Sequence, residues 1–269
     1  MDQAKTPTGQ SVGQVAHSDS SANGATWQER YLERFYPLSS WRRDGTKEFF
    51  SLCERFCRGK ILEIGAGPSN RTSDYLATLG ELHGLDVDSE VLGNQALTTA
   101  SVIKDRFPFP DSSFDACASD FVCEHVSDPR GHLREIWRVL KPGGVYLFRT
   151  PNKFHYVAMV SALTPHSFHL KVANRLRRYE GHDPYPTHYR FNSSRKIAES
   201  ARQLGFTVEY LQLTEWEPSY GMSSRVLFLL FTMYERLVNS SSFFSNFRAN
   251  LFVVLRKPAV GPLGSPSVV

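Results

Sequence analysis

The sequence predicts an α/β fold with a doubly wound, mostly parallel sheet. Short apolar runs alternate with helical patterns along most of the chain, and the first run leads into a glycine-rich turn and then a helix. Parallel neighbouring strands need crossover connections, which the intervening helices supply. The 269 residues, 41% hydrophobic and 22% charged, are enough for one large domain of this class.

The elements are predicted in order from their apolar spacing. Trp27, Tyr31 and Phe35 share one helical face, and a second apolar face lies between 49 and 57, so two amphipathic helices precede the first strand. Strands are then expected at 61–64, 82–87, 114–119, 145–148, 207–213 and 251–256. Helices are expected at 69–79, from residue 88, at 129–140, at 194–204 with Ser194 as the cap, and at 224–238.

Composition sets the predicted boundaries. Residues 1–25 are rich in Gln, Ser, Gly and Thr, so this segment and the segment 258–269 are expected to be disordered tails. Residues 26–257 are expected to form a single domain with a core at 47–152 and two long insertions, 151–193 and 214–249. Ligands of an open α/β sheet collect at the carboxyl ends of its strands, so both insertions are expected to fold over the ligand as a helical cap.

Charge is divided unevenly along the chain. Residues 1–148 hold 16 Lys and Arg against 20 Asp and Glu, whereas residues 149–269 hold 15 against 7, and the net charge is +4. The basic residues form no continuous run, so no nucleic-acid partner is expected. A basic pocket for an anionic small molecule fits the same distribution.

Apolar runs and cysteines indicate the compartment. The longest apolar run, 226–231, is far shorter than the roughly 20 residues that span a bilayer, and the start of the chain does not have the pattern of a secretory signal. The four cysteines form no CxxC pair and have no histidine at zinc-finger spacing. We therefore expect reduced core thiols, no metal site and a cytoplasmic protein.

The glycine-rich turn and a later acid point to an adenosine ligand. Gly65 and Gly67 follow the first strand, and Asp86 closes the next strand about 20 residues on, where an acid can accept hydrogen bonds from ribose hydroxyls. A dinucleotide fingerprint requires a third glycine at position 70, where this chain has Asn70. The pattern therefore favours an adenosine ligand without a required phosphate over a nicotinamide dinucleotide.

Four segments carry a family resemblance. They are Glu63-Ile-Gly-Ala-Gly67, Phe107-Pro-Phe-Pro-Asp-Ser-Ser-Phe-Asp115, Glu124-His-Val126 and Arg138-Val-Leu-Lys-Pro-Gly-Gly144. In order and spacing they resemble class I S-adenosylmethionine-dependent methyltransferases of the type 11 domain family. The resemblance implies a Rossmann-like seven-stranded sheet, S-adenosylmethionine as the cofactor, and an enzyme that transfers methyl groups.

The resemblance also implies the cofactor-binding residues. Glu63, Gly65, Ala66 and Gly67 would line the methionine part of the cofactor, and Asp86 would bind the ribose. Further implied contacts, to adenine and to the methyl exit, are Val87, Ser119 and Asp120.

Two positions depart from the family pattern. Ser69 stands where the family has a third glycine, which is acceptable if φ there is negative. Asp105 lies slightly late for the acid that usually contacts the adenine amino group, since Val102 and Ile103 occupy the usual place.

Methyl transfer to a hydroxyl needs a base as well as alignment. Imidazole is suited to proton transfer at neutral pH. His125 after the fourth strand and His155 after the fifth are the histidines expected nearest the methyl exit, and each has a structural role as its alternative.

The insertions indicate an acceptor class. The first is basic and holds five of the nine histidines, and the second is strongly apolar. We therefore expect an amphiphilic or anionic small-molecule acceptor, such as a sugar, a lipid-linked compound or a natural product, methylated on oxygen. The alternative is a basic solvated lid beside a core helix.

The helix at 224–238 is apolar on nearly all sides. Such a helix is buried, forms a homodimer contact or makes a peripheral membrane contact, and burial is the preferred interpretation. For the whole chain, the alternatives to an enzyme of this kind are a catalytically silent S-adenosylmethionine-binding partner subunit and, less well supported, a nicotinamide-dependent oxidoreductase.

Overall fold

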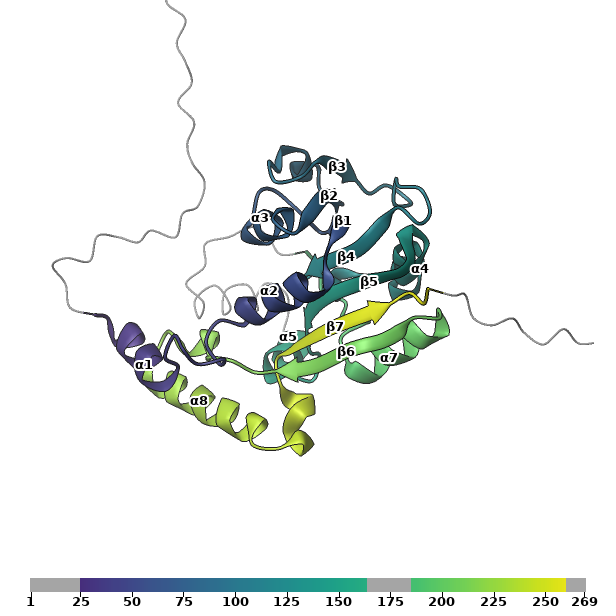
Figure 1. The fold of residues 1–269 in the computed structure, drawn as a ribbon. Coiled ribbons are helices and arrows are strands. Elements are labelled where there is room, and N and C mark those ends of the chain that lie inside the picture. The colour runs from purple at the N-terminus through teal and green to yellow at the C-terminus, as the bar shows by residue number, and fades with distance from the viewer. Residues whose placement is uncertain (1–24, 164–184, 260–269) are drawn as a thin grey trace, which may run out of the picture.

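Seven strands form one sheet in the order β3-β2-β1-β4-β5-β7-β6 (Figure 1). The computed structural model describes residues 25–163 and 185–259. The strands are β1 (Gly59–Ile64), β2 (Gly80–Asp86), β3 (Thr99–Val102), β4 (Phe114–Asp120), β5 (Leu140–Pro151), β6 (Thr207–Thr214) and β7 (Asn250–Arg256). Only β7 runs antiparallel to its neighbours, so the sheet is mostly parallel, as predicted.

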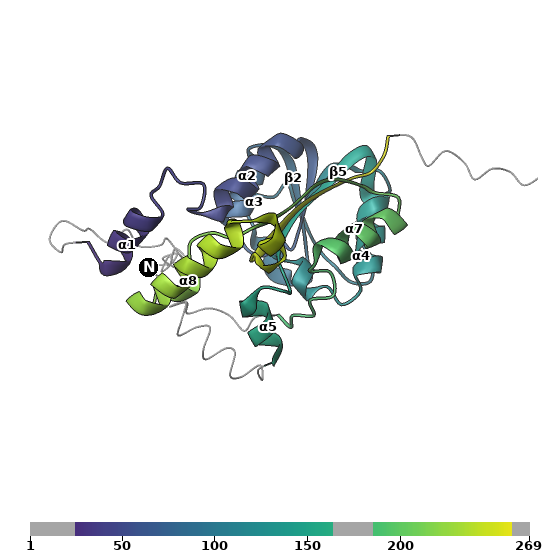
Figure 2. The ribbon, with the colours of Figure 1, turned by 90° about the horizontal axis from the view of Figure 1, so that it is seen from below.

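Helices cover both faces of the sheet, which makes the fold doubly wound (Figure 2). The helices that surround the sheet are α2 (Gly45–Phe56), α3 (Arg71–Ala77), α4 (Pro129–Val139) and α7 (Ser194–Gln203). Phe49 and Leu76 from α2 and α3 belong to one buried cluster, and Ile136 and Ile197 from α4 and α7 belong to the other. The two apolar faces of the central strands are thus both covered, as parallel sheets require.

Three further helices lie outside this sandwich: α1 (Trp27–Phe35), α5 (Tyr156–Leu163) and α8 (Arg225–Asn239). Single 3-10 turns are η1 (Ser89–Gly93), η2 (Cys123–His125), η3 (Ser219–Gly221) and η4 (Ser242–Phe247). The expected helix from residue 88 is therefore only η1. The N-cap of α7 is Ser193 rather than Ser194.

The structure corrects the expectation that the helix at 224–238 is buried, because only one of its faces is covered. Phe228 on α8 is fully buried among the rings of Trp27, Tyr31, Phe35 and Tyr36 at the end of α1. The opposite face of α8 is exposed, because α1 covers only one side of the helix.

All four cysteines are free and buried, as expected for core thiols. Burial raises the pKa of the Cys123 thiol to about 12, so it stays protonated and unreactive at neutral pH. Among the described residues, no helix is both long and apolar enough to cross a membrane. The predicted tails, 1–25 and 258–269, lie almost entirely outside the described residues.

Candidate active site

A cavity of about 800 Å³ opens at the carboxyl ends of β1, β2, β3 and β4. This is the edge where ligands of open α/β sheets bind. Its wall includes Ile64, Gly65, Asp86, Val87, Ile103, Asp105, Phe107, Asp120, Phe121, Val122, His125, Tyr185, Pro186 and His188. Six of the eleven residues expected at the site therefore meet at one cavity: Gly65, Asp86, Val87, Asp105, Asp120 and His125.

The glycine-rich turn brings backbone rather than side chain to this cavity. Gly65 has φ of 74°, and a Cβ placed there would lie 2.3 Å from Cγ2 of Val122. Only glycine fits, because the conformation and the space both exclude a side chain. Gly67 also has positive φ, 52°, but faces open space.

The side chain of Asn70 caps the N-terminus of α3, the helix that follows the turn. Oδ1 of Asn70 accepts hydrogen bonds from the amides of Thr72 at 2.8 Å and Ser73 at 3.0 Å, and its Nδ2 donates to the carbonyl of Ala66 at 2.6 Å. The amide groups that hold a pyrophosphate in dinucleotide-binding proteins are thus already used. This arrangement disfavours a nicotinamide dinucleotide. Ser69 is not among the residues with positive φ, so its departure from glycine is accommodated.

Asp86 is fixed in orientation at the end of β2. Its Oδ2 accepts from the amide of Gly67 at 2.8 Å, and its Oδ1 accepts from the amide of Asp88 at 2.9 Å. The carboxylate lies in the cavity wall and retains lone pairs for further donors, such as vicinal hydroxyls. Val87 is 61% exposed and adds apolar surface beside it.

Glu63 lies behind the turn rather than in the cavity wall. Its Oε2 accepts a hydrogen bond from Oγ of Ser73 at 2.7 Å, and burial raises its pKa to about 8. Ser73 also accepts from Nδ2 of Asn94, which reaches the carbonyls of the turn. Glu63 is thus part of a buried network that supports the turn, and neither Ala66 nor Gly67 lines the cavity.

The end of β4 carries an ion pair that the sequence did not reveal. Asp120 accepts from both Nε and Nη2 of Arg149, the latter at 2.8 Å, and from Oγ1 of Thr72 at 3.0 Å. The buried guanidinium lies over the rings of Phe49 and Phe121. The carboxylate of Asp120 therefore faces the cavity with its charge already balanced. The only sequence signal was a single arginine in an apolar strand.

Ser119 points away from the cavity. It is buried, and its Oγ lies 2.7 Å from the hydroxyl of Tyr146 in the core.

A hydrogen bond from one ring nitrogen fixes the orientation of the His125 ring. Its Nδ1 donates to the carbonyl of Pro186 at 3.1 Å, which leaves Nε2 of the neutral ring as the acceptor. Nε2 lies 4.0 Å from Oε1 of Glu124, whose pKa burial raises to about 7. Oε2 of Glu124 in turn accepts from Oγ1 of Thr150 at 3.0 Å. Glu124 was visible only as a motif neighbour of His125.

The structure does not bring His155 to this cavity. The chain after β5 turns toward α8, so His155 lies buried with Nε2 3.4 Å from Oε2 of Glu215 and its ring near Tyr156 and Tyr234. Burial lowers its pKa to about 4.

One insertion covers the cavity and the other does not. The hydroxyl of Tyr185 donates to Oδ2 of Asp88 at 3.2 Å, and the amide of His188 donates to the carbonyl of Glu124 at 2.7 Å. The segment 185–188 thus forms one side of the cavity, while His166, His169 and His182 of the first insertion lie outside the described residues. The cavity wall contains no residue of the second insertion, 214–249, because its helix α8 packs against α1 instead.

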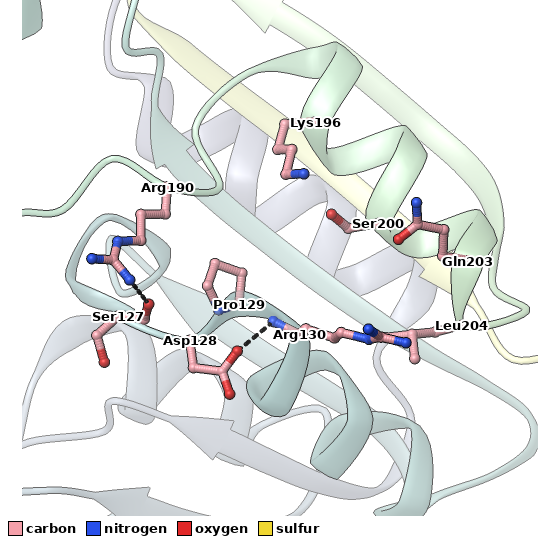
Figure 3. Close-up of a pocket in the computed structure, with 9 residues that line it drawn as sticks. All are labelled: Ser127, Asp128, Pro129, Arg130, Arg190, Lys196, Ser200, Gln203 and Leu204. Atoms are coloured by element: carbon pink, nitrogen blue, oxygen red, sulfur yellow. Dashed lines mark hydrogen bonds between the residues drawn. The ribbon is translucent and has the colours of Figure 1, made fainter.

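A smaller cavity of about 310 Å³, whose wall is drawn in Figure 3, shares Ser127 and Asp128 with the first. Its wall is basic, with Arg130, Arg190 and Lys196. The carboxylate of Asp128 is used in capping α4, where Oδ1 accepts from the amides of Arg130 and Gly131. The cationic groups therefore dominate this wall.

Comparison with known proteins identifies the domain. A family model described as a methyltransferase domain, type 11, matches residues 62–148. A malonyl-[acyl-carrier protein] O-methyltransferase from Erwinia billingiae is 35% identical over 109 residues, which is 39% of this chain and 43% of that protein. A ubiquinone/menaquinone biosynthesis C-methyltransferase, UbiE, from Edwardsiella ictaluri is 28% identical over 171 residues, 58% of this chain and 64% of that protein.

The chain thus spans about half the length of the curated relatives it matches. The fold extends further: a crystal structure of the [4+2]-cyclase SpnF superposes with a TM-score of 0.53 at 19% identity, covering 83% of this chain and 84% of that one. Residues 62–148 therefore resemble the methyltransferase domain that this family model describes.

Proposed function

We propose that this chain transfers the methyl group of S-adenosylmethionine to an oxygen of a small-molecule acceptor. The observation that carries this proposal is the meeting of the Gly65 turn, the fixed Asp86 carboxylate and His125 at one cavity. Adenosine without a phosphate suits this wall, since Asn70 already caps α3.

Cofactor binding is proposed for specific residues. Asp86 accepts hydrogen bonds from the ribose hydroxyls, and Val87 with Asp105 borders the adenine. The backbone at Gly65 approaches the methionine part closely, which a Cβ at that position would prevent. When bound, the sulfonium supplies an electrophilic methyl group.

His125 is the proposed general base. Its Nε2 would take the proton of the acceptor hydroxyl as that oxygen displaces the neutral thioether from the methyl carbon, so that the new carbon–oxygen bond replaces the carbon–sulfur bond. Glu124 is a positioning residue whose Oε1 lies 4.0 Å from Nε2, and the carbonyl of Pro186 fixes the ring. His155 keeps no catalytic role in this proposal, because its ring is enclosed by Tyr156 and Tyr234.

The adjoining basic cavity supports an anionic acceptor. Arg130, Arg190 and Lys196 face a space that meets the larger cavity at Ser127 and Asp128. An acceptor with a phosphate or carboxylate at one end and an apolar part at the other, as in an anionic sugar, lipid-linked or natural-product molecule, would extend from one cavity into the other. The buried thiols suit a cytoplasmic location.

The second candidate is a catalytically silent S-adenosylmethionine-binding subunit, because residues that bind the cofactor do not by themselves require transfer of its methyl group. The relatives named above act on oxygen in one case and on carbon in the other. The choice of oxygen rests on His125.

Methyl transfer is tested by incubating the protein with labelled S-adenosylmethionine and fractionated small-molecule extract. We expect one fraction to gain label, and His125→Gln to reduce the rate about 100-fold with unchanged cofactor affinity, since a general base contributes on that order. His155→Gln is the matched control and should change the rate little. Cofactor binding without transfer to any fraction would favour the silent subunit, and full activity of His125→Gln would remove the proposed base.

A further inference from the structure

The outward face of α8 is a continuous apolar stripe. It consists of Val226, Leu229, Leu230, Met233 and Leu237, which are 66%, 38%, 53%, 67% and 53% exposed. Their spacing of three and four residues places them on one side of the helix. Both ribbon views place α8 at the periphery of the molecule, with α1 beside it (Figures 1 and 2).

Packing against α1 holds this stripe outward. Phe228 on the opposite side is buried among aromatic rings of α1, and Glu235 is 1% exposed. The Glu235 carboxylate is bound by Arg42 at 3.2 Å and by the hydroxyl of Tyr36 at 3.2 Å. A rotation of α8 that buried the stripe would break these contacts and expose a carboxylate network.

The charges on α8 have one sign wherever they reach solvent. Arg225 at the start of the helix is exposed. Arg236 near its other end is 40% exposed, with Nη1 3.4 Å from Oε2 of the buried Glu235, which is the remaining charged residue of the helix. The neighbouring α1 adds two glutamates and two arginines, hence no net charge. The face is therefore apolar with cationic ends, complementary to an apolar layer under an anionic surface.

Two exposed phenylalanine rings follow α8 in the chain, on η4. Phe243 and Phe247 on η4 are 80% and 45% exposed, and the hydroxyl of Tyr234 donates to the carbonyl of Phe247 at 2.6 Å. Phenylalanine is among the residues that membrane-surface helices bury at the boundary between lipid headgroups and acyl chains.

We propose that α8 and η4 form a membrane-contact surface that lies flat in the interface of an anionic bilayer. A second copy of this chain fits less well, because an antiparallel pair of α8 helices would bring Arg225 of each copy next to Arg236 of the partner. The surface is separate from the cavity wall, so this proposal does not depend on methyl transfer.

Co-sedimentation with vesicles tests the proposal on the full chain. The probes are vesicles of phosphatidylcholine alone and vesicles of phosphatidylcholine mixed with phosphatidylglycerol. We expect binding to the anionic vesicles that added salt weakens, and a roughly five-fold loss for Arg225→Gln, as expected for one arginine near an anionic surface. Arg195→Gln, an exposed arginine on α7, should bind as the parent chain does.

Met233→Ser provides the apolar test, with Leu92→Ser on η1 as its matched control, since the two side chains are 67% and 62% exposed. Met233→Ser should lose about ten-fold in vesicle binding, on the scale of one apolar side chain leaving water, whereas Leu92→Ser should lose none. Leu230→Ser should repeat the loss, and thermal unfolding would verify that each variant is folded. Three results would each overturn the proposal. The parent chain could fail to bind vesicles, or Met233→Ser and Leu92→Ser could lose binding equally. The third is a dimer that Met233→Ser dissociates, without any vesicle binding.

Discussion

Gly65 and Gly67 share positive φ but differ in what stands beside them. At Gly65 the side chain of Val122 occupies the place of a Cβ, and at Gly67 no atom outside the adjacent residues lies within 4 Å of that place. The sequence identified both glycines as parts of one turn, yet the different surroundings depend on a residue more than 50 positions later. Such a difference is visible only when the strands are brought together.

Alanine substitutions should separate these two positions. Gly67→Ala should cost about 1–2 kcal/mol in unfolding free energy, the left-handed penalty alone. Gly65→Ala adds overpacking against Val122, so its total should reach about 2–5 kcal/mol. Urea unfolding of both variants measures the difference, and equal losses would show that Val122 does not confine the turn.

The ends of β4 and β5 are joined by two ion pairs of unequal burial. Asp120 and Arg149 are cross-strand partners with side chains 16% and 9% exposed, and Asp115 pairs with Lys141 near the other end with side chains 41% and 42% exposed. Removing one partner of a buried pair leaves an uncompensated charge, whereas an exposed pair is screened by water.

Arg149→Met should therefore destabilise the protein by about 3 kcal/mol, because the largely buried Asp120 carboxylate is left without its cationic partner. Lys141→Met, the control on the same strand pair, should cost less than about 1 kcal/mol. Thermal or urea unfolding compares them, and losses of similar size would contradict the unequal roles.

Strong local patterns predicted most elements, and weak ones did not. β1, β2, β4 and α4 have clear apolar spacing, with glycine or proline at an end of β1, β2 and α4, and the structure has all four within a few residues of the predicted bounds. β3 is four residues long and only partly buried, so its sequence, TASV, carries little pattern. The orientation of α8 depended on α1, which lies about 200 residues earlier.

At the scale of the whole molecule, buried carboxyl groups set the pH dependence of stability. Burial raises the pKa of Glu63 to about 8, of Glu124 to about 7 and of Glu215 to about 8. It lowers the pKa of His132 and of His155 to about 4. Both kinds of shift disfavour the charged form of a group removed from water.

Stability should fall as pH rises from 6.5 to 8. In this range the unfolded chain has ionised glutamates, while the native state still holds protons on the buried ones, so the native state binds more protons and loses stability with increasing pH. Each such group contributes at most about 1.4 kcal/mol per pH unit. Below pH 6.5 the two histidines oppose the trend, since protons bind them more readily in the unfolded chain.

Unfolding free energies measured at pH 6.5 and pH 8 test this effect. In Glu215→Gln, the decrease in unfolding free energy between these two pH values should be smaller than in the parent chain. Glu209→Gln, on the exposed side of β6, should leave the slope unchanged. A stability that increases from pH 6.5 to 8 would contradict the buried, protonated state of these carboxyls.

The uneven distribution of charge along the chain is partly reflected in the walls of the two cavities. The acidic half contains Asp86 and Asp120 in the cavity wall, and the basic half contributes Arg190 and Lys196 to the adjoining cavity. The sequence predicted which residues end the strands, and therefore much of the site. It could not predict which later side chains reach them, as Arg149 and Tyr185 do, because those contacts depend on the complete sheet.

Calorimetric titration of the protein with S-adenosylmethionine tests the central claim, that the cavity at Asp86 holds this cofactor. We expect one molecule bound per chain, and at least ten-fold weaker binding by Asp86→Asn, because hydrogen bonds to a charged acceptor contribute about 1.5–3 kcal/mol. Asp88→Asn, whose carboxylate contacts Tyr185 instead, should bind almost as the parent chain does. Absence of binding by the parent chain, or unchanged affinity in Asp86→Asn, would contradict this account.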